Sequence, residues 1–202
     1  MLDSAPIVSV RDQIAQQLRA DIINGVLMEN TKLKEQELAK RFGVSRGPVR
    51  DVLLQLSKEG LLVSKNNCGV SVNSSPKEEL QPLMIETRIN IETFAMKLVV
   101  NELDDDDFSK LEDLLSKLNQ AFTDENYFLV TEIDMAFHRF FVHKAGGDDL
   151  VNLWQPFIYR MRMNYKRLTN AQECYDEHKT ILDAMKAKDI KTAISALKGN
   201  IK

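Results

Sequence analysis

The sequence predicts a mainly α-helical protein. An N-terminal winged helix-turn-helix, with three helices and a two-stranded wing, is joined to a C-terminal antiparallel bundle of about six helices. A glycine-containing turn at 43–45 separates two amphipathic runs, as in a helix-turn-helix. β-prone pieces at 61–73 predict the wing, and after them strand patterns nearly vanish while helical periodicity continues. These observations divide the chain into two domains, 1–75 and 76–202.

The composition is that of an ordinary globular protein and excludes several classes. Of 202 residues, 44% are hydrophobic and 28% are charged, which is typical of a packed chain rather than a disordered one. No apolar run reaches the length of a membrane span, and the N-terminus lacks the features of a secretory signal. Cys68 and Cys174 lie far apart without CxxC spacing, so we expect free thiols in a reducing, cytoplasmic compartment.

Charge is distributed unequally between the two domains. The net charge of −3 combines +2 in residues 1–75 with −5 in the remainder. A mildly basic N-terminal part in an acidic chain is compatible with nucleic-acid binding by that part alone, although differences of this size are common.

Three helices build the expected first domain. The first carries an apolar stripe, Val10, Ile14, Leu18 and Ile22, and ends near Gly25. The second ends near Phe42, with Leu38 also facing inward. Gly43 supplies a turn that requires a positive φ, Val44 fills the corner, and Ser45 caps the third helix. That helix turns four apolar residues inward: Val49, Val52, Leu53 and Leu56.

Two arginines follow the turn and point to DNA. In a helix-turn-helix the N-terminal residues of the second helix enter the major groove, where Arg46 and Arg50 would lie. A guanidinium binds guanine or phosphate through two parallel hydrogen bonds. The alternatives are a solvated polar face, or a pairing of Arg50 with Asp51 or Asp21. The turn, the cap and the wing favour DNA.

The wing extends this surface. A ribbon with KNNCG at its tip places Lys65, Asn66 and Asn67 within reach of the minor groove or the phosphate backbone. The alternative is a simple surface hairpin.

The second domain divides into six expected helices. Ser75 is a suitable N-cap and Pro76 a suitable first residue for the first of them. We expect the third to stop at Gly146-Gly147 and Pro156 to kink or delay the fourth. The six segments are 76–102, 105–122, 125–144, 149–168, 171–187 and 190–201.

A carboxylate and a histidine share one helix face in this domain. Asp134 and His138 are spaced i and i+4, so they can bind one cation, and His178 lies on a later helix. Each histidine alone is equally explained as a buried side chain satisfied by a neighbour. His143 is offset by five residues from His138 and is left as surface or core.

Residues 33–72 resemble the winged helix-turn-helix of the GntR family of bacterial transcription regulators. The match includes Leu33, Glu35, Leu38, Ala39, Gly43, Val44, Ser45, Arg46, Pro48, Val49, Arg50, Leu53, Leu56, Glu59, Gly60, Leu61, Gly69 and Val72. The resemblance implies that Arg46, Arg50 and Gln36 contact operator DNA, although the position of Gln36 is often arginine. Asp51 replaces the usual glutamate. The expected DNA-contact residues are thus Arg46, Arg50, Gln36, Ser45, Lys65, Asn66, Asn67 and Gly69.

The all-helical second domain resembles the FadR subfamily, in its branch with the shorter, six-helix FCD-type effector domain. The resemblance implies a divalent metal such as zinc, nickel or manganese, bound by Asp134, His138, His178 and a fourth histidine. That fourth position is Asn200 here. Because an amide oxygen is a poorer ligand than imidazole, we expect a weakened site, a harder metal with more water, or an empty site.

The same resemblance implies an effector, commonly a small organic acid. Arg88 and Glu92 match a recurrent R-x-x-x-E of the first effector helix, and Arg88 is a natural partner for a carboxylate. A salt bridge from Arg88 to Glu92 or Glu132 is the equal alternative. Asn200 is a second expected effector contact.

These expectations describe a homodimeric DNA-binding repressor that is tuned by an effector, and not an enzyme. Two alternatives stay open. The helical domain can serve dimerisation alone, a view that the substitution at Asn200 supports. The Asp134, His138 and His178 set also occurs in metalloenzymes, but no general base or nucleophile motif accompanies it.

Overall fold

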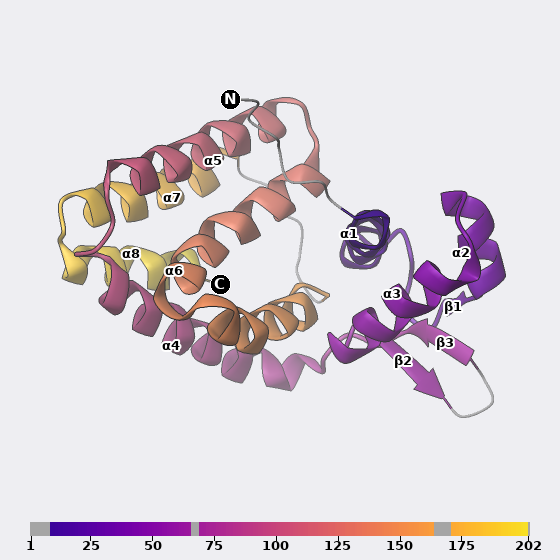
Figure 1. The fold of residues 1–202 in the computed structure, drawn as a ribbon. Helices are drawn as coiled ribbons and strands as arrows, with labels where there is room; N and C mark the ends of the chain where they lie inside the picture. Colours follow the sequence, from indigo (N-terminus) through magenta and orange to yellow (C-terminus); the bar gives the residue numbers. More distant parts are fainter. Residues whose placement is uncertain (1–8, 66–68, 164–170, 202) are drawn as a thin grey trace. The chain divides into compact units, whose positions relative to one another are not determined.

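The computed structural model describes residues 9–65, 69–163 and 171–201, which form two compact units (Figure 1). The first comprises Met1–Lys77 with Pro156–Asn164, and the second Glu78–Gln155 with Tyr165–Lys202. Across the described residues, no helix combines the length and the apolar character needed to cross a membrane.

The first unit contains three helices and a small antiparallel sheet. The helices are α1 (Val10–Ile23), α2 (Glu35–Phe42) and α3 (Arg46–Lys58), and the strands are β1 (Lys32–Leu33), β2 (Leu62–Lys65) and β3 (Gly69–Val72). The strand order is β1-β3-β2, so β3 is central and pairs with both neighbours. The expected wing is confirmed, and β1 is an addition, because two residues are too few to show an alternating pattern.

The core of this unit forms between α1 and α3. Ile14, Leu18 and Ile22 are buried as expected, whereas Val10 is exposed because it opens the helix at its N-terminal end. All four expected residues of α3 are buried: Val49, Val52, Leu53 and Leu56.

The turn between α2 and α3 has the expected backbone. Gly43 adopts φ 65° in the left-handed region, which a side chain would disfavour. Ser45 occupies the N-cap position of α3 with an extended backbone, but its hydroxyl makes no capping bond. The expected side-chain cap is therefore wrong, and Ser45 remains exposed at the start of the helix.

The last turns of helix α6 (Tyr127–Arg162) also belong to the first unit. The Arg19 guanidinium lies 4.7 Å above the centre of the Tyr159 ring and is held there by two hydrogen bonds to Glu59, at 2.8 and 2.9 Å. The Arg160 side chain crosses Gly60, where an added Cβ would approach its Cδ to 3.1 Å. Helix α6 thus contributes residues to both units.

The second unit is helical. After a 3-10 turn (Glu78–Leu80), it contains α4 (Gln81–Val99), α5 (Asp105–Thr123), most of α6, α7 (Ala171–Lys186) and α8 (Ile190–Asn200). Gly146 (φ −144°) and Gly147 (φ 56°) interrupt α6, as expected, so that it consists of two helical segments. Pro156 lies inside the second segment, and the non-helical angles of α6 are at the glycines rather than at the proline.

The helix starts follow their capping residues. Asp104 and Asp107 form a reciprocal capping box at the start of α5. The expectation for Ser75 is wrong, because α4 begins only at Gln81. The Ser75 amide and hydroxyl instead donate to the Glu29 carboxylate.

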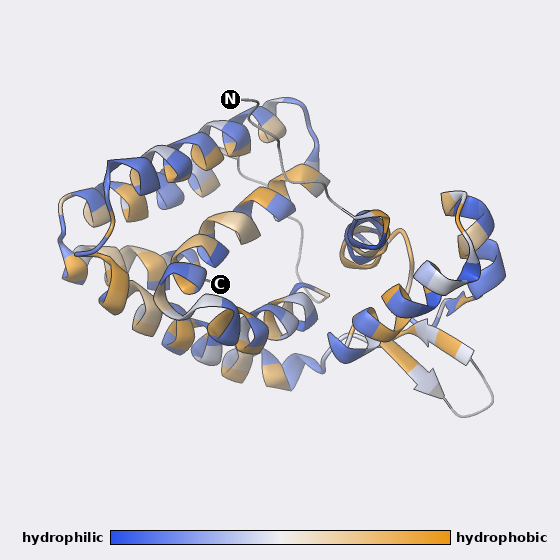
Figure 2. Ribbon diagram, viewed as in Figure 1, coloured by the Kyte–Doolittle hydropathy of each residue, from blue (hydrophilic) through white to orange (hydrophobic). Residues whose placement is uncertain are grey.

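A single apolar interior holds the second unit together. Figure 2 shows hydrophobic and hydrophilic residues alternating along its helices. The largest fully buried side chains of this unit are Met96, Leu111, Leu118, Phe137, Phe141, Trp154 and Ile181. This interior encloses three buried polar residues, Asp134, His138 and His178.

Candidate DNA-contact surface and candidate metal centre

The two arginines of α3 share one carboxylate partner. Arg46 Nη2 donates to Glu35 Oε2 at 2.9 Å, and Arg50 donates to both Glu35 oxygens at 3.1 and 3.2 Å. The bonds from Arg50 and then Arg46 lower the pKa of Glu35 below its usual value, so it is ionised at neutral pH. Both arginine side chains stay more than 60% exposed.

Arg50 binds Glu35 and neither of the two partners considered from the sequence, Asp51 and Asp21. Asp51 pairs with Arg11 at 3.3 Å, and Asp21 pairs with Arg41 at 2.7 Å. Glu35 was not expected in this role, because it opens α2 and meets the arginines only when α2 packs on α3. The arrangement presents two aligned guanidinium groups with a net charge of +1.

The other expected DNA contacts lie in α2 and at the ends of the two wing strands. Gln36 is exposed next to Glu35 in α2. Lys65 ends β2 and pairs through its backbone with Gly69, which opens β3 at φ 78°. The expectations for Asn66 and Asn67 fall outside the described residues.

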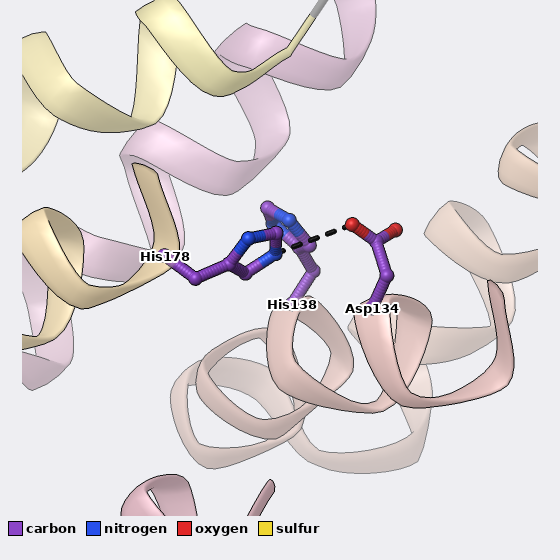
Figure 3. Close-up of side chains that lie close together, drawn as sticks. All are labelled: Asp134, His138 and His178. Atoms are coloured by element: carbon purple, nitrogen blue, oxygen red, sulfur yellow. Dashed lines mark ion pairs between the residues drawn. The ribbon is translucent and has the colours of Figure 1, made fainter. Parts of the chain in front are cut away.

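A buried cluster of three side chains, all of types that bind metals in proteins, lies in the second unit (Figure 3). Asp134 and His138 come from the first segment of α6, and His178 comes from α7. One ligand atom from each residue lies within 4.8 Å of the others. His178 Nε2 is 3.2 Å from Asp134 Oδ1, the contact drawn as a dashed line in Figure 3.

Both histidines direct Nε2 toward this cluster. The Nδ1–H of His178 donates to the Cys174 carbonyl at 2.7 Å, because a carbonyl can only accept. The Nδ1–H of His138 donates to Glu92 Oε2, also at 2.7 Å. His138 Nε2 is buried and has no hydrogen-bond partner among the described residues. In its neutral form each ring therefore carries, on Nε2, the lone pair that a metal requires.

The charges around His138 support this assignment. Burial raises the pKa of Glu92, but the charges of Arg88 and His138 outweigh it and bring the pKa to about 2. Burial lowers the pKa of His138 to about 4 despite the opposing effect of Glu92. Glu92 is thus ionised and His138 neutral at pH 7. Two imidazole lone pairs and a carboxylate, all buried, fit a divalent transition metal.

Three more predicted residues have definite places. Arg88 is buried and donates to Glu92 Oε1 at 2.8 Å, so one of the two salt bridges considered is formed. The Asn200 amide donates to Glu177 Oε2 at 3.1 Å. His143 is an exposed residue, 3.7 Å from Asp148. The buried thiol of Cys174 is free, whereas Cys68 is outside the described residues.

Family models match both parts of the chain. Residues 10–72 match the bacterial regulatory proteins of the gntR family, and residues 83–202 match the FCD domain. The chain belongs to the GntR family. It is therefore a DNA-binding transcription regulator with an FCD effector-binding domain, and not an enzyme. FCD domains often bind a metal.

Relatives and solved structures agree with this membership. The chain is 29% identical to the uncharacterized HTH-type transcriptional regulator YdhC of Bacillus subtilis strain 168, over 90% of this chain and 83% of YdhC. It is 27% identical to the HTH-type transcriptional repressor GlaR of Escherichia coli K12, over 91% of this chain and 89% of GlaR. The structure of E. coli McbR/YncC has the same fold, with a TM-score of 0.79, 24% identity and coverage of 96% and 94%.

Proposed function

We propose that this GntR-family regulator is a cytoplasmic, homodimeric repressor that binds operator DNA through residues 1–75 and senses a small organic acid through residues 76–202. The observation that carries the DNA part is the pair Arg46 and Arg50, exposed at the start of α3 and aligned by Glu35. Gln36, Ser45 and the wing extend the same contact surface.

The two arginines have separate tasks in this proposal. A guanidinium that binds a guanine edge supplies sequence discrimination, whereas one that binds phosphate supplies affinity for any DNA. Their common bond to Glu35 restricts their rotamers before binding, which lowers the entropy lost in the complex.

The decisive experiment compares operator binding of wild type with an Arg46→Ala, Arg50→Ala double variant. Genomic fragments selected by the wild-type protein supply the operator. We expect each base-contacting arginine to be worth about 1–3 kcal/mol, so the double variant binds at least tenfold more weakly. Arg139→Ala removes an exposed arginine of the second unit and is the matched control. Unchanged affinity in the double variant would overturn the assignment.

For the second domain, we propose that Asp134, His138 and His178 hold one zinc, nickel or manganese ion, with positions left for water and for a carboxylate of the effector. The support is the buried Nε2 of His138, which has no hydrogen-bond partner in the described part of the chain, and the neutral tautomers that Glu92 and the Cys174 carbonyl favour for the two histidines. The effector carboxylate would also meet Arg88, whose Nε is engaged by Glu92.

Asn200 takes a secondary role in this site. Its amide nitrogen is directed to Glu177, so only its carbonyl oxygen is offered to a metal or an effector. Three protein ligands with open positions are sufficient for a metal that also coordinates a small acid.

Metal content of the tag-free protein tests this part, with Asp134→Ala alongside. We expect about one divalent ion per chain in wild type and a large loss in the variant. No ion after incubation with zinc, nickel and manganese would leave the alternative of a DNA-binding dimer without a sensor, which the Asn200–Glu177 bond favours.

We propose that the dimer forms through the exposed apolar side of α4. Leu83, Phe94 and Leu98 are 60%, 55% and 46% exposed, and their spacing places them along one side of the helix. Large apolar side chains grouped in this way mark a protein interface. A two-fold dimer presents two copies of α3 to the half-sites of a palindrome.

A further inference from the structure

Glu92 lies between the candidate metal centre and the second segment of α6. Its carboxylate is fully buried on α4 and accepts three side-chain hydrogen bonds. His138 Nδ1 binds Oε2 at 2.7 Å, whereas Arg88 Nε and Trp154 Nε1 each bind Oε1 at 2.8 Å. One side chain therefore ties a metal-ligating histidine to an indole sixteen residues further along the same helix.

The geometry assigns to Glu92 two linked tasks: it positions His138 for the metal, and it transmits occupancy of the metal centre to Trp154. The inference rests on the metal centre proposed above. It adds Glu92, which would not touch the metal, and it adds Trp154, on the second helical segment of α6, as the side chain that responds to metal binding.

The positioning task follows from the tautomer of His138. A neutral imidazole that donates Nδ1–H to a carboxylate must keep its lone pair on Nε2, and the bond also fixes the plane of the ring. The other groups packed on Glu92, Arg88 and Trp154, are donors as well, so the carboxylate cannot turn without losing bonds in a dry interior.

The transmitting task follows from the sharing of one carboxylate. A cation at Nε2 withdraws electron density from the ring and makes Nδ1–H a stronger donor. The Glu92 carboxylate then shifts charge toward Oε2 and accepts less strongly at Oε1, where Trp154 is bound. Water cannot compensate, because His138, Glu92 and Trp154 are fully buried.

Trp154 makes the inference measurable, because it is the only tryptophan of the chain. Its emission reports the hydrogen bond of its own indole N–H. We expect zinc added to metal-free wild type to change the Trp154 emission, with saturation at one equivalent per chain. Metal affinity is measured in parallel by competition with a chromophoric chelator, and cobalt absorption reports the geometry of the ligands.

The principal variant is Glu92→Gln, which keeps the size but permits an amide N–H to face His138 Nδ1 and so favours the wrong tautomer. We expect metal affinity to fall 10–100-fold, the cobalt spectrum to change and the Trp154 response to disappear. Because this variant leaves Arg88 buried without its carboxylate, an Arg88→Met, Glu92→Gln double variant removes the ion pair as a unit and guards against misfolding. Circular dichroism confirms that each variant is folded.

The outcomes separate this inference from the proposed metal centre. If the wild-type protein binds no metal, the proposed metal centre and the role of Glu92 are both overturned. If wild type binds metal and loses it in Asp134→Ala, but both Glu92 variants keep wild-type affinity, cobalt spectrum and Trp154 response, the centre stands and the role of Glu92 is overturned. Weaker metal binding together with a silent Trp154 in the folded double variant is the supporting result.

Discussion

At the scale of single residues, buried and half-buried carboxylates organise both candidate sites. Glu35 aligns Arg46 and Arg50 at the surface, and Glu92 aligns His138 in the interior. The physical setting differs. Glu35 works beside water, where an ion pair contributes little stability, whereas Glu92 is fully desolvated and depends on its three donors. We therefore expect Glu35 to affect which DNA is bound, and Glu92 to affect the shape of the proposed metal centre.

Replacing Glu35 with glutamine separates alignment from charge. The variant gains one unit of positive charge at the DNA face and loses the carboxylate that holds both arginines. We expect binding to random DNA to strengthen, and the slope of the logarithm of its binding constant against the logarithm of salt concentration to become steeper by about one. The preference for operator over random DNA should fall by about 1–3 kcal/mol. Titrations of both DNAs at several salt concentrations measure these quantities.

The control for that experiment is Glu37→Gln, because Glu37 is exposed on the same helix and pairs with its neighbour Lys34 at 2.7 Å. It changes the charge equally without touching the arginines. Equal loss of specificity in the two variants would show that charge alone acts and that the alignment by Glu35 is irrelevant.

At the scale of elements, capping residues decide where helices begin. The Asp107 amide donates to the Asp104 carboxylate at 2.8 Å, and the Asp104 amide donates to the Asp107 carboxylate, so two backbone amides at the start of α5 are satisfied. The Ser75 hydroxyl donates to Glu29 instead, and α4 starts at Gln81, five residues later than a Ser75 cap would imply. The same residue type caps a helix or binds elsewhere according to what the fold places beside it.

We expect Asp104→Ala to destabilise the protein by about 1 kcal/mol, because it removes the cap of α5. Asp105→Ala removes the same charge from the exposed first turn of the same helix without removing the cap. It should lower the free energy of unfolding by only about 0.3 kcal/mol. Urea unfolding followed by circular dichroism gives both values. Similar losses in the two variants would attribute the effect to the helix dipole instead of the cap.

At the scale of the whole molecule, helix α6 carries residues of both units along one continuous stretch of chain. It carries Asp134 and His138, then Trp154, and its last turns place Tyr159 and Arg160 against Arg19 and Gly60 of the first unit. The proposed operator is a palindrome with two half-sites, so we expect the regulator to bind as two copies, and the apolar side of α4 is the surface proposed for their contact.

A Phe94→Asp, Leu98→Asp variant should be monomeric, because two charges would be buried without partners in the proposed dimer contact. Light scattering coupled to gel filtration should then give one mass of 23.1 kDa in place of twice that value. Operator affinity should fall by more than tenfold as the second half-site contact is lost. Leu129→Asp, at an exposed leucine of α6, is the control, and a double variant that remains dimeric would move the interface elsewhere.

The sequence by itself determined what depends on neighbours within a few turns. Helical periodicity predicted the order of the helices, and Gly43 predicted the turn between α2 and α3. Gly146 and Gly147 predicted the break in α6. The i, i+4 spacing placed Asp134 and His138 on one helix face. Matching of residues 33–72 to a family pattern gave the class of protein, which the family models confirm.

Only the tertiary structure decided the contacts between residues that are distant in the chain. The bond of Glu35 to both arginines, the approach of His178 to Asp134 and the three bonds of Glu92 require helices to pack in a particular way. Polar side chains have several equivalent partners in a sequence, as Arg50 and Arg88 had here. Packing selects among them, because a buried charge is stable only beside the partner that the fold brings within hydrogen-bonding distance.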